Sequence, residues 1–301
     1  MIPIIHNRRI FFIISGIFVG ASILALIFWG LKLGIDFTGG SLMQIEFKNE
    51  RPSISATQDK LKDLGLGNIS TQPIGDKGYI LKFKDVNEEI HQKILSELGV
   101  PAEAEEKSFE SVGPVIGQEL KSRSLWAIGG VLLMIIIYIA YAFRKVSRPV
   151  ASWRYGVAAI LALLHDVTIP TGLFVVLGHF LEAEAGLLFV TAILTILGFS
   201  VHDTIVVFDR IRENLRKGGS GDFENTVEAS INQTIGRSIT TSLVVIFTLF
   251  SIYLFGGETT KYFSLILLIG VFFGTYSSIF IASSLLVSWE RLRQKRLTAK
   301  K

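Results

Sequence analysis

The chain has 301 residues, of which 50% are hydrophobic and 19% charged, and its formal net charge at pH 7 is +4. Its mean hydropathy of +0.49 excludes a single soluble domain of this length and indicates a protein that crosses the membrane several times. Because the chain has no cysteine, disulfides and thiolate chemistry are excluded as well.

Six apolar runs are each long enough to cross a membrane. A helix needs about 20 mostly apolar residues to span the hydrocarbon core, whereas a β-barrel would show short alternating segments. The runs cover residues 10–31, 125–143, 155–178, 187–208, 238–255 and 262–289. The first run is too long for a signal peptide and has no small-residue cleavage site, so we expect it to be retained. The sequence therefore predicts six transmembrane helices.

Basic residues flank the runs on one side, and the short loops on the other side hold only Lys261. They are Arg8, Arg9, Arg144, Lys145, Arg148, Arg154, Arg210, Arg212, Arg216, Lys217, Arg291, Arg293, Lys295, Arg296, Lys300 and Lys301. The positive-inside rule then places both termini in the cytoplasm. Residues 209–237 become a cytoplasmic loop, expected to hold a pair of helices around a turn at 218–222, and residues 290–301 a basic tail. The net charge follows from this topology and requires no nucleic-acid partner.

Residues 32–124 form a polar segment between the first two runs, outside the membrane. Alternation or helical spacing of apolar residues predicts a strand at 41–47, a helix at 54–65, two strands at 68–75 and 78–84, and a helix at 86–99. Residues 102–113 supply a last strand. This βαββαβ order predicts a ferredoxin-like α+β domain. It has no metal-ligand cluster and no nucleophile–base pair, so a binding or mechanical role fits better than catalysis, and a purely structural cap is the alternative.

Ionisable residues inside the predicted helices are the main candidates for function, because they are rare in membranes and usually face a bundle interior or a water-filled path. His165 and Asp166 lie about eleven residues into the third helix, which at about 1.5 Å per residue is close to the midplane. His202 and Asp203 lie in the cytoplasmic part of the fourth helix, and Arg237 begins the fifth.

Metal and hydrolase chemistry are poorly supported by these residues. The two His-Asp pairs recur in similar contexts, but adjacent helical residues point about 100° apart, so each pair offers one ligand to a shared site. The spacing of a metalloprotease motif is missing, and no G-x-S-x-G occurs. Intramembrane proteolysis by Asp166 and Asp203 remains formally possible, although nothing around either residue favours it. We expect no cofactor and no enzymatic activity.

A proton relay is the chemistry that Asp203 fits best. A short connection joins the fourth and fifth helices, so Asp203 and Arg237 lie at similar depth and are able to pair. Burial raises an aspartate pKa and a nearby guanidinium lowers it, which allows the carboxylate to take and release a proton as its partner moves. Thr204 and Thr240 are hydroxyl neighbours on the same helices. The alternatives are that Arg237 extends to the membrane interface and that Asp203 makes a static hydrogen bond.

Five motifs in order resemble the SecF family, subunits of the bacterial Sec protein-export machinery in the RND superfamily. They are GIDFTGG (34–40), SVGPVIGQEL (111–120), LLHDV in the third helix, GFSVHDTIVVFDRIREN (198–214) and NQTIGRSITTSL around the start of the fifth helix. The resemblance covers nearly the whole chain. It departs from the family pattern at His202, where the family often has asparagine.

The resemblance implies a bacterial inner-membrane protein that works with SecD and uses the proton-motive force to promote export of polypeptides. It implies that Asp203 and Arg237, with Asp166, Thr204 and Thr240, belong to a proton pathway. The implied partners are SecD, the SecYEG translocon, YajC and unfolded preprotein held by the extracytoplasmic domain. An RND-type exporter of small molecules or lipids is the alternative, although a single outer segment of this size argues against it. A sodium-coupled version of the same motor uses the same residues.

The GIDFTGG motif is a candidate hinge between the first helix and the extracytoplasmic domain. Gly34, Gly39 and Gly40 permit backbone angles that other residues resist. Asp36 takes part in the hinge or instead caps the following backbone through an Asx-turn.

Overall fold

The computed structural model describes residues 2–143, 150–218 and 222–298. The chain divides into two compact units, a helical unit of Met1–Lys32 and Ala127–Lys301 and a sheet unit of Leu33–Trp126. Residues 219–221 of the predicted turn at 218–222 lie outside the described residues, as do the basic residues at 144, 145, 148, 300 and 301 that contributed to the orientation argument.

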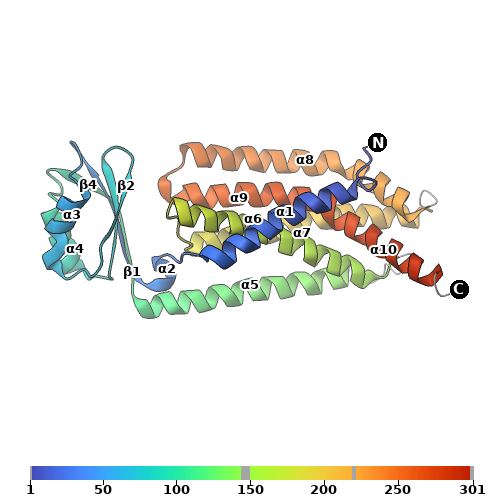
Figure 1. Cartoon of the computed structure of the whole chain (residues 1–301), viewed down its shortest axis with the longest axis horizontal. Helices are drawn as coiled ribbons and strands as arrows, with labels where there is room; N and C mark the ends of the chain where they lie inside the picture. The colour runs from blue at the N-terminus through green and yellow to red at the C-terminus, as the bar shows by residue number, and fades with distance from the viewer. Residues whose placement is uncertain (1, 144–149, 219–221, 299–301) are drawn as a thin grey trace. The chain divides into compact units, whose positions relative to one another are not determined.

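Six helical segments are long and apolar enough to span a membrane, as predicted (Figure 1). Five of them are single helices and the sixth is a continuous run of an α-helix, a π-helix and another α-helix. Their bounds are α1 (Arg8–Trp29), α5 (Pro114–Ala142), α6 (Ser152–Phe180), α7 (Leu187–Arg216), α8 (Phe223–Phe255), α9 (Glu258–Tyr276), the π-helix η2 (Ser277–Ala282) and α10 (Ser283–Thr298). The chain is therefore a multi-pass membrane protein.

Three helices extend well beyond their apolar runs. Helix α7 continues to Arg216 and α8 already begins at Phe223, so the polar segment between them consists of extensions of the two spans. Ile211 and Val227 are fully buried there, and this packing keeps both extensions helical where polarity marked only the end of the apolar run. Helix α5 starts at Pro114, at a first helical position where a missing N–H costs nothing.

Glycines bring the spans into close contact. A Cβ on Gly270 of α9 would lie 2.2 Å from Ile196 of α7, and one on Gly172 of α6 would lie 2.2 Å from Ser22 of α1. A Cβ on Gly274 would lie 3.3 Å from the Ser200 side chain. Small residues at helix contacts let backbones approach in membranes, and here they place α9 directly against α7.

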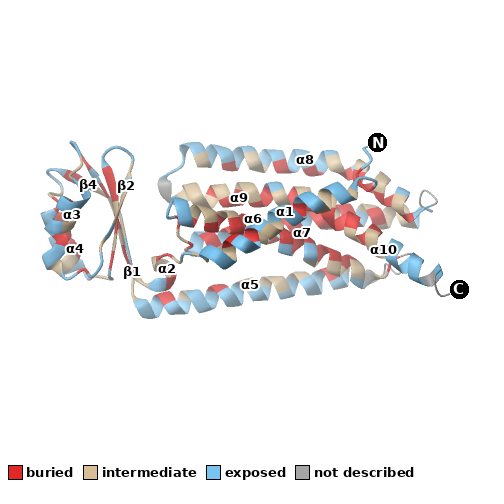
Figure 2. Ribbon diagram, in the orientation of Figure 1, coloured by how far each residue is buried: buried red, intermediate tan, exposed pale blue. Residues whose placement is uncertain are grey.

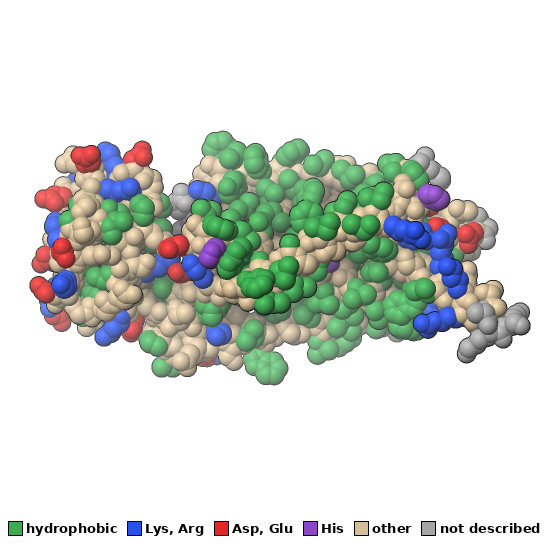
Figure 3. Space-filling model, in the orientation of Figure 1, with side chains coloured by type: hydrophobic (Ala, Val, Ile, Leu, Met, Phe, Trp, Pro, Cys, Tyr) green, Lys and Arg blue, Asp and Glu red, His purple; other side chains and the backbone are tan. Residues whose placement is uncertain are grey.

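The outward surface of the helical unit is apolar. In Figure 2, α5 is exposed along most of its length, while the inner faces of α6 and α7 are buried. Exposed side chains on different helices include Leu133, Phe247 and Phe18, and hydrophobic groups dominate this surface in Figure 3. Such a surface is stable in lipid.

The sheet unit contains four strands and two helices, with a short helix α2 (Ile35–Thr38) at its start. In chain order they are β1 (Gly40–Phe47), α3 (Ile54–Leu61) with a 3-10 turn (Lys62–Leu64), β2 (Ser70–Ile74), β3 (Gly78–Phe83), α4 (Glu88–Glu97) and β4 (Ala104–Val112). The strand order is β2-β3-β1-β4 and every pairing is antiparallel. The Pro73 ring sits in β2, an edge strand, where a residue without an N–H is tolerated.

Helices α3 and α4 cover one face of this sheet (Figure 1). Met43, Ile45 and Leu81 from the central strands and Ile94 from α4 are fully buried in the shared core. Both helices start with a side-chain cap, because Ser53 accepts from the Ala56 amide at 3.2 Å and Asn87 from the Ile90 amide at 3.1 Å. Local capping and a common apolar core therefore define the unit.

The GIDFTGG and SVGPVIGQEL segments pack against each other within the sheet unit. Gly39 has φ +76° and a Cβ there would lie 2.8 Å from the Cα of Pro114, while a Cβ on Gly117 would lie 2.9 Å from the Gly39 nitrogen. Gly40 also has a positive φ, whereas Gly34 has an extended backbone that any residue adopts. Asp36 lies in the first turn of α2. Close packing thus gives Gly39 a second reason to be glycine.

Candidate functional site

Among the described residues, two of the buried carboxylates lie within the predicted apolar runs of the membrane-spanning helices. Asp166 of α6 is 0% exposed and Asp203 of α7 is 8% exposed. A charged side chain at such a position costs several kcal/mol by roughly every scale. Both sites consist entirely of side chains from the helical unit, and hydroxyl groups supply most of their hydrogen bonds.

Asp203 is held by one serine on each side. Its Oδ1 accepts from Ser238 Oγ of α8 at 2.6 Å, and its Oδ2 accepts from Ser278 Oγ of η2. Both serines are buried. The carboxylate therefore joins α7 to two other helical segments that are far apart in sequence.

Asp166 has a richer set of partners. Its Oδ2 accepts from Ser277 Oγ at 2.6 Å and from Ser200 Oγ, and its Oδ1 lies 2.8 Å from His165 Nδ1. The other ring nitrogen of His165 lies 3.1 Å from Ser15 Oγ of α1. A neutral ring that donates its Nδ1–H to the carboxylate leaves Nε2 to accept from that serine.

The two carboxylates are connected through the same two elements. Ser200 and Asp203 are three residues apart on α7, and so lie on one face of the helix. Ser277 and Ser278 are adjacent in the π-helix, and each one binds a different aspartate. Single π-turns inside α-helices are frequent at functional sites. A change at one carboxylate therefore has a direct structural route to the other.

Each π-helix serine has a second acceptor within reach. Ser277 Oγ lies 3.1 Å from the carbonyl oxygen of Gly274, and Ser278 Oγ lies 2.9 Å from that of Thr275. A hydroxyl has one hydrogen to donate and lone pairs to accept. If an aspartate takes a proton, its serine can donate to the backbone carbonyl and accept from the carboxylic acid. Both protonation states of the aspartates are thus satisfied without moving heavy atoms.

Arg237 does not form the predicted pair with Asp203. Its side chain is exposed in this chain, and no ion pair joins it to Asp203 among the residues that the structure describes. The next residue, Ser238, faces the carboxylate instead. Because successive side chains on a helix point about 100° apart, Arg237 and Ser238 cannot both face it. The depth argument placed Arg237 correctly along the helix axis but gave no information on the direction of its side chain.

The two predicted threonines lie outside the hydrogen bonds of Asp203. Thr204 is buried next to it in sequence, but no hydrogen bond joins the two side chains in the described part of the chain. Thr240 is exposed and its Oγ1 donates to the Gly236 carbonyl at 2.8 Å. His202 is also exposed. Asp203 is therefore hydrogen-bonded by serines rather than by these groups.

Sequence reasoning missed the four serines that bind the carboxylates. Ser277 and Ser278 lie inside the sixth apolar run and Ser238 at the start of the fifth, so hydropathy alone gave no sign of their role. The spacing of Ser200 from Asp203 was a usable signal, because residues three apart share a helix face. Across residues 2–143, 150–218 and 222–298, no group of three or more His, Asp or Glu is arranged to hold a metal ion.

Comparison with known proteins places these features in a family. The model described as "Protein export membrane protein SecD/SecF, C-terminal" matches residues 91–292, and the "SecD/SecF GG Motif" matches residues 25–50. The protein translocase subunit SecF of Thermobaculum terrenum is 45% identical over 96% of this chain and 94% of its own length. That of Haemophilus influenzae is 34% identical over 91% of this chain and 82% of its own.

Solved structures give the same result at the level of the fold. The crystal structure of SecDF, a translocon-associated membrane protein from Thermus thermophilus, has a TM-score of 0.82 and 29% identity over 95% of this chain. SecDF in a super-membrane-facing form has a TM-score of 0.70 at 29% identity. The chain spans only 38% and 40% of the length of these two proteins.

Proposed function

The chain belongs to the SecF family of Sec protein translocase subunits, and we propose that it couples protonation of Asp203 to protein export. As a member of the family it is an accessory subunit of the Sec translocase in the membrane. The proposal concerns three further points: the coupling ion, the residue that carries it, and the partners through which the subunit acts.

The observation that carries the proposal is the pair of hydrogen bonds that Ser238 and Ser278 donate to Asp203. A static structural carboxylate needs donors that fix one charge state. Here Ser278 can donate either to the carboxylate or to the Thr275 carbonyl, so the neutral acid is accommodated as well as the anion. Proton relays in membranes use carboxylates that accept both states. Asp203 also links α7 to two other helical segments, so its charge state bears on how the three pack.

The available energy is sufficient for a conformational step. At a proton-motive force of roughly 180 mV, each proton supplies about 4 kcal/mol. That biases a two-state equilibrium by about a thousandfold. One proton per cycle through Asp203 is thus enough to drive a movement of the extracytoplasmic unit.

SecD is the proposed partner of the helical unit within the membrane. Transporters of this type commonly use two related halves around a midplane site, and this chain is less than half the length of each solved SecDF protein. His202 and Arg237, the sequence neighbours of the hydrogen-bonded Asp203 and Ser238, are both exposed. Polar groups at this depth favour a protein neighbour over lipid. The SecYEG translocon and YajC complete the proposed assembly.

The sheet unit is proposed to be a ferredoxin-like domain that holds unfolded preprotein outside the cytoplasm. Its βαββαβ order and the strand order β2-β3-β1-β4 support that classification. The basic residues Arg8 and Arg9 at the start of α1 and Arg291 in α10 support cytoplasmic termini. The Gly39–Gly40 segment supplies the proposed hinge, with Asp36 in the short helix before it.

The test is protein translocation into inverted vesicles that carry Asp203→Asn, with the proton gradient on or off. Asparagine keeps the size and one acceptor but takes up no proton, so we expect the gradient-dependent part of export to disappear while the complex still assembles. The matched control is Asp209→Asn, on the same helix with a 56% exposed side chain, which should export normally. Gradient-dependent export retained in D203N contradicts the proposal.

Sodium is the second candidate coupling ion. Asp203 is surrounded by the hydroxyl oxygens of Ser238 and Ser278, and hard cations prefer oxygen ligands. Replacing the proton gradient by a sodium gradient in the same vesicles separates the two, because only the true coupling ion restores export. Solute flux in the absence of a translocating protein would instead favour an RND-type exporter.

A further inference from the structure

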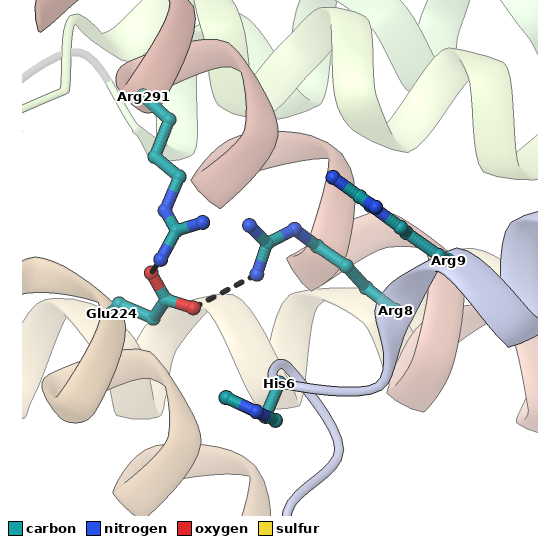
Figure 4. A pocket seen from close by; sticks show the side chains of 5 residues that line it. All are labelled: His6, Arg8, Arg9, Glu224 and Arg291. Carbon is teal, nitrogen blue, oxygen red and sulfur yellow. Dashed lines mark hydrogen bonds and ion pairs between the residues drawn. The ribbon is translucent and has the colours of Figure 1, made fainter.

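A cavity of about 230 Å³ lies at the end of the helical unit where α1 begins (Figure 4). It is lined by His6, Arg8, Arg9, Glu224 and Arg291. His6 lies in the segment leading into α1, Arg8 and Arg9 in the first turn of α1, Glu224 in the first turn of α8 and Arg291 in α10. Three guanidinium groups thus converge from two different helices on a space that also receives a carboxylate.

Glu224 orients two of the arginines without neutralising the cavity. Its Oε1 accepts from Arg8 at 2.8 Å and its Oε2 from Arg291 at 2.6 Å. Arg9 forms no ion pair with any described residue, and a guanidinium has five N–H donors. With His6 neutral, three arginines and one glutamate leave a net charge of +2 around the cavity.

A second ion pair nearby, between Arg154 and Glu290, is an example of an arginine whose charge is enclosed by protein groups. Arg154 donates to Glu290 at 2.9 Å, with side chains only 12% and 6% exposed, and its guanidinium lies over the rings of Trp153 and Trp289. That cation is enclosed by its partners. The cavity at Arg9 is open and has excess positive charge, so it has room for an anion.

The surroundings indicate what kind of anion the cavity fits. Immediately after the arginines, α1 presents Ile10, Ile13 and Ile17 on its exposed side, in a helix of span length. Figure 3 shows Lys and Arg side chains gathered at this end, next to hydrophobic surface. The cavity is smaller than the roughly 300–1,000 Å³ of drug-sized pockets, but a phosphate group fits well. Basic pockets between spans at the membrane surface bind anionic head groups.

We propose that this cavity is a binding site for the phosphate of an anionic membrane phospholipid, whose acyl chains lie along the exposed apolar face of α1. The arginines bind the phosphate oxygens through paired N–H groups, as guanidinium does with phosphate generally. Because Arg8 and Arg291 also hold α8 through Glu224, the lipid would tie α1, α8 and α10 together. The site does not depend on proton coupling.

The experiment is native mass spectrometry of the full-length chain in detergent, titrated with phosphatidylglycerol, phosphatidylcholine or inorganic phosphate. We expect one tightly retained phosphatidylglycerol and weaker retention of phosphatidylcholine. The double variant Arg9→Gln/Arg291→Gln should weaken the first phosphatidylglycerol by roughly 30-fold, from about 1 kcal/mol per surface charge. Lys295→Gln removes a charge from exposed α10 surface outside the cavity and should leave binding unchanged.

A charge-retaining variant guards against misfolding. Arg9→Lys/Arg291→Lys keeps the attraction for phosphate, so it should bind far better than the glutamine variant. Equal binding of phosphatidylglycerol by the wild type and the glutamine variant would overturn the proposal, as would equal retention of phosphatidylcholine. If inorganic phosphate displaces the lipid, the cavity binds a soluble phosphate anion and the lipid assignment is wrong.

Discussion

The two units of this protein place polar and apolar side chains in opposite ways. In the sheet unit, Met43 and Leu81 are fully buried, and an ion pair such as Lys93–Glu89 has side chains 56% and 74% exposed. In the helical unit, Leu133 is 58% exposed while Asp166 is completely buried. The difference follows from the solvent, since lipid accepts apolar groups and excludes charge. A charge in the sheet unit therefore needs no explanation, whereas one inside the helical unit points to function.

The strongest test of this contrast is one substitution made in both units. Leu81→Ala removes a fully buried side chain from β3 and should destabilise the sheet unit by about 2–5 kcal/mol. Leu133→Ala on α5 should cost less than about 0.5 kcal/mol, because the leucine contacts an equally apolar solvent. Hydrogen exchange of β3 and α5 peptides in the full chain measures both. A large loss of protection in L133A would show that α5 packs against protein at that position.

A second test compares a buried with an exposed aspartate. Asp166→Ala leaves His165 and Ser200 without the carboxylate that they hydrogen-bond, and should lower the unfolding free energy by about 2–3 kcal/mol. Asp209→Ala breaks only an exposed pair with Arg212 at 2.6 Å, which should cost about 0–1 kcal/mol. Thermal unfolding of the purified protein in detergent gives both values. Equal melting temperatures for the two variants would mean that the hydrogen bonds of Asp166 add nothing to stability.

The smallest expected effect is a pH dependence in the sheet unit. Hydrogen bonds from Gln92 and His91 hold the pKa of Glu88 below its ordinary value. A carboxylate with a lowered folded pKa contributes stability above its unfolded pKa and loses it as the pH falls through the folded one. We therefore expect the protection factors of α4 amides against hydrogen exchange to fall below about pH 4.

Glu88→Gln tests this by removing the titrating group. The variant should show a flatter dependence of the α4 protection factors on pH in the acid range. Glu97→Gln, at the other end of the same helix, serves as the control and should keep the wild-type profile. An unchanged profile in E88Q would mean that other carboxyl groups account for the acid sensitivity of α4.

Much of the fold was predictable, because it depends on local patterns. Apolar runs of span length predicted six membrane helices, and the motifs around Gly39 and Asp203 predicted the family. The ends of α7 and α8 were not predictable in this way. There Ile211 and Val227 are fully buried, and only packing between the two extensions shows why the helices continue through polar sequence.

The candidate site divides along the same line. The sequence by itself determined that Asp166 and Asp203 are carboxylates within membrane spans, since hydropathy and position along the chain are enough to show their cost. Only the tertiary structure decided their partners, because Ser238, Ser277 and Ser278 reach them across 35 to 111 residues. It also left Arg237 exposed, with no ion pair to Asp203 in the described part of the chain. A helix fixes the depth of a residue, but the direction of its side chain has meaning only once the neighbouring helices are in place.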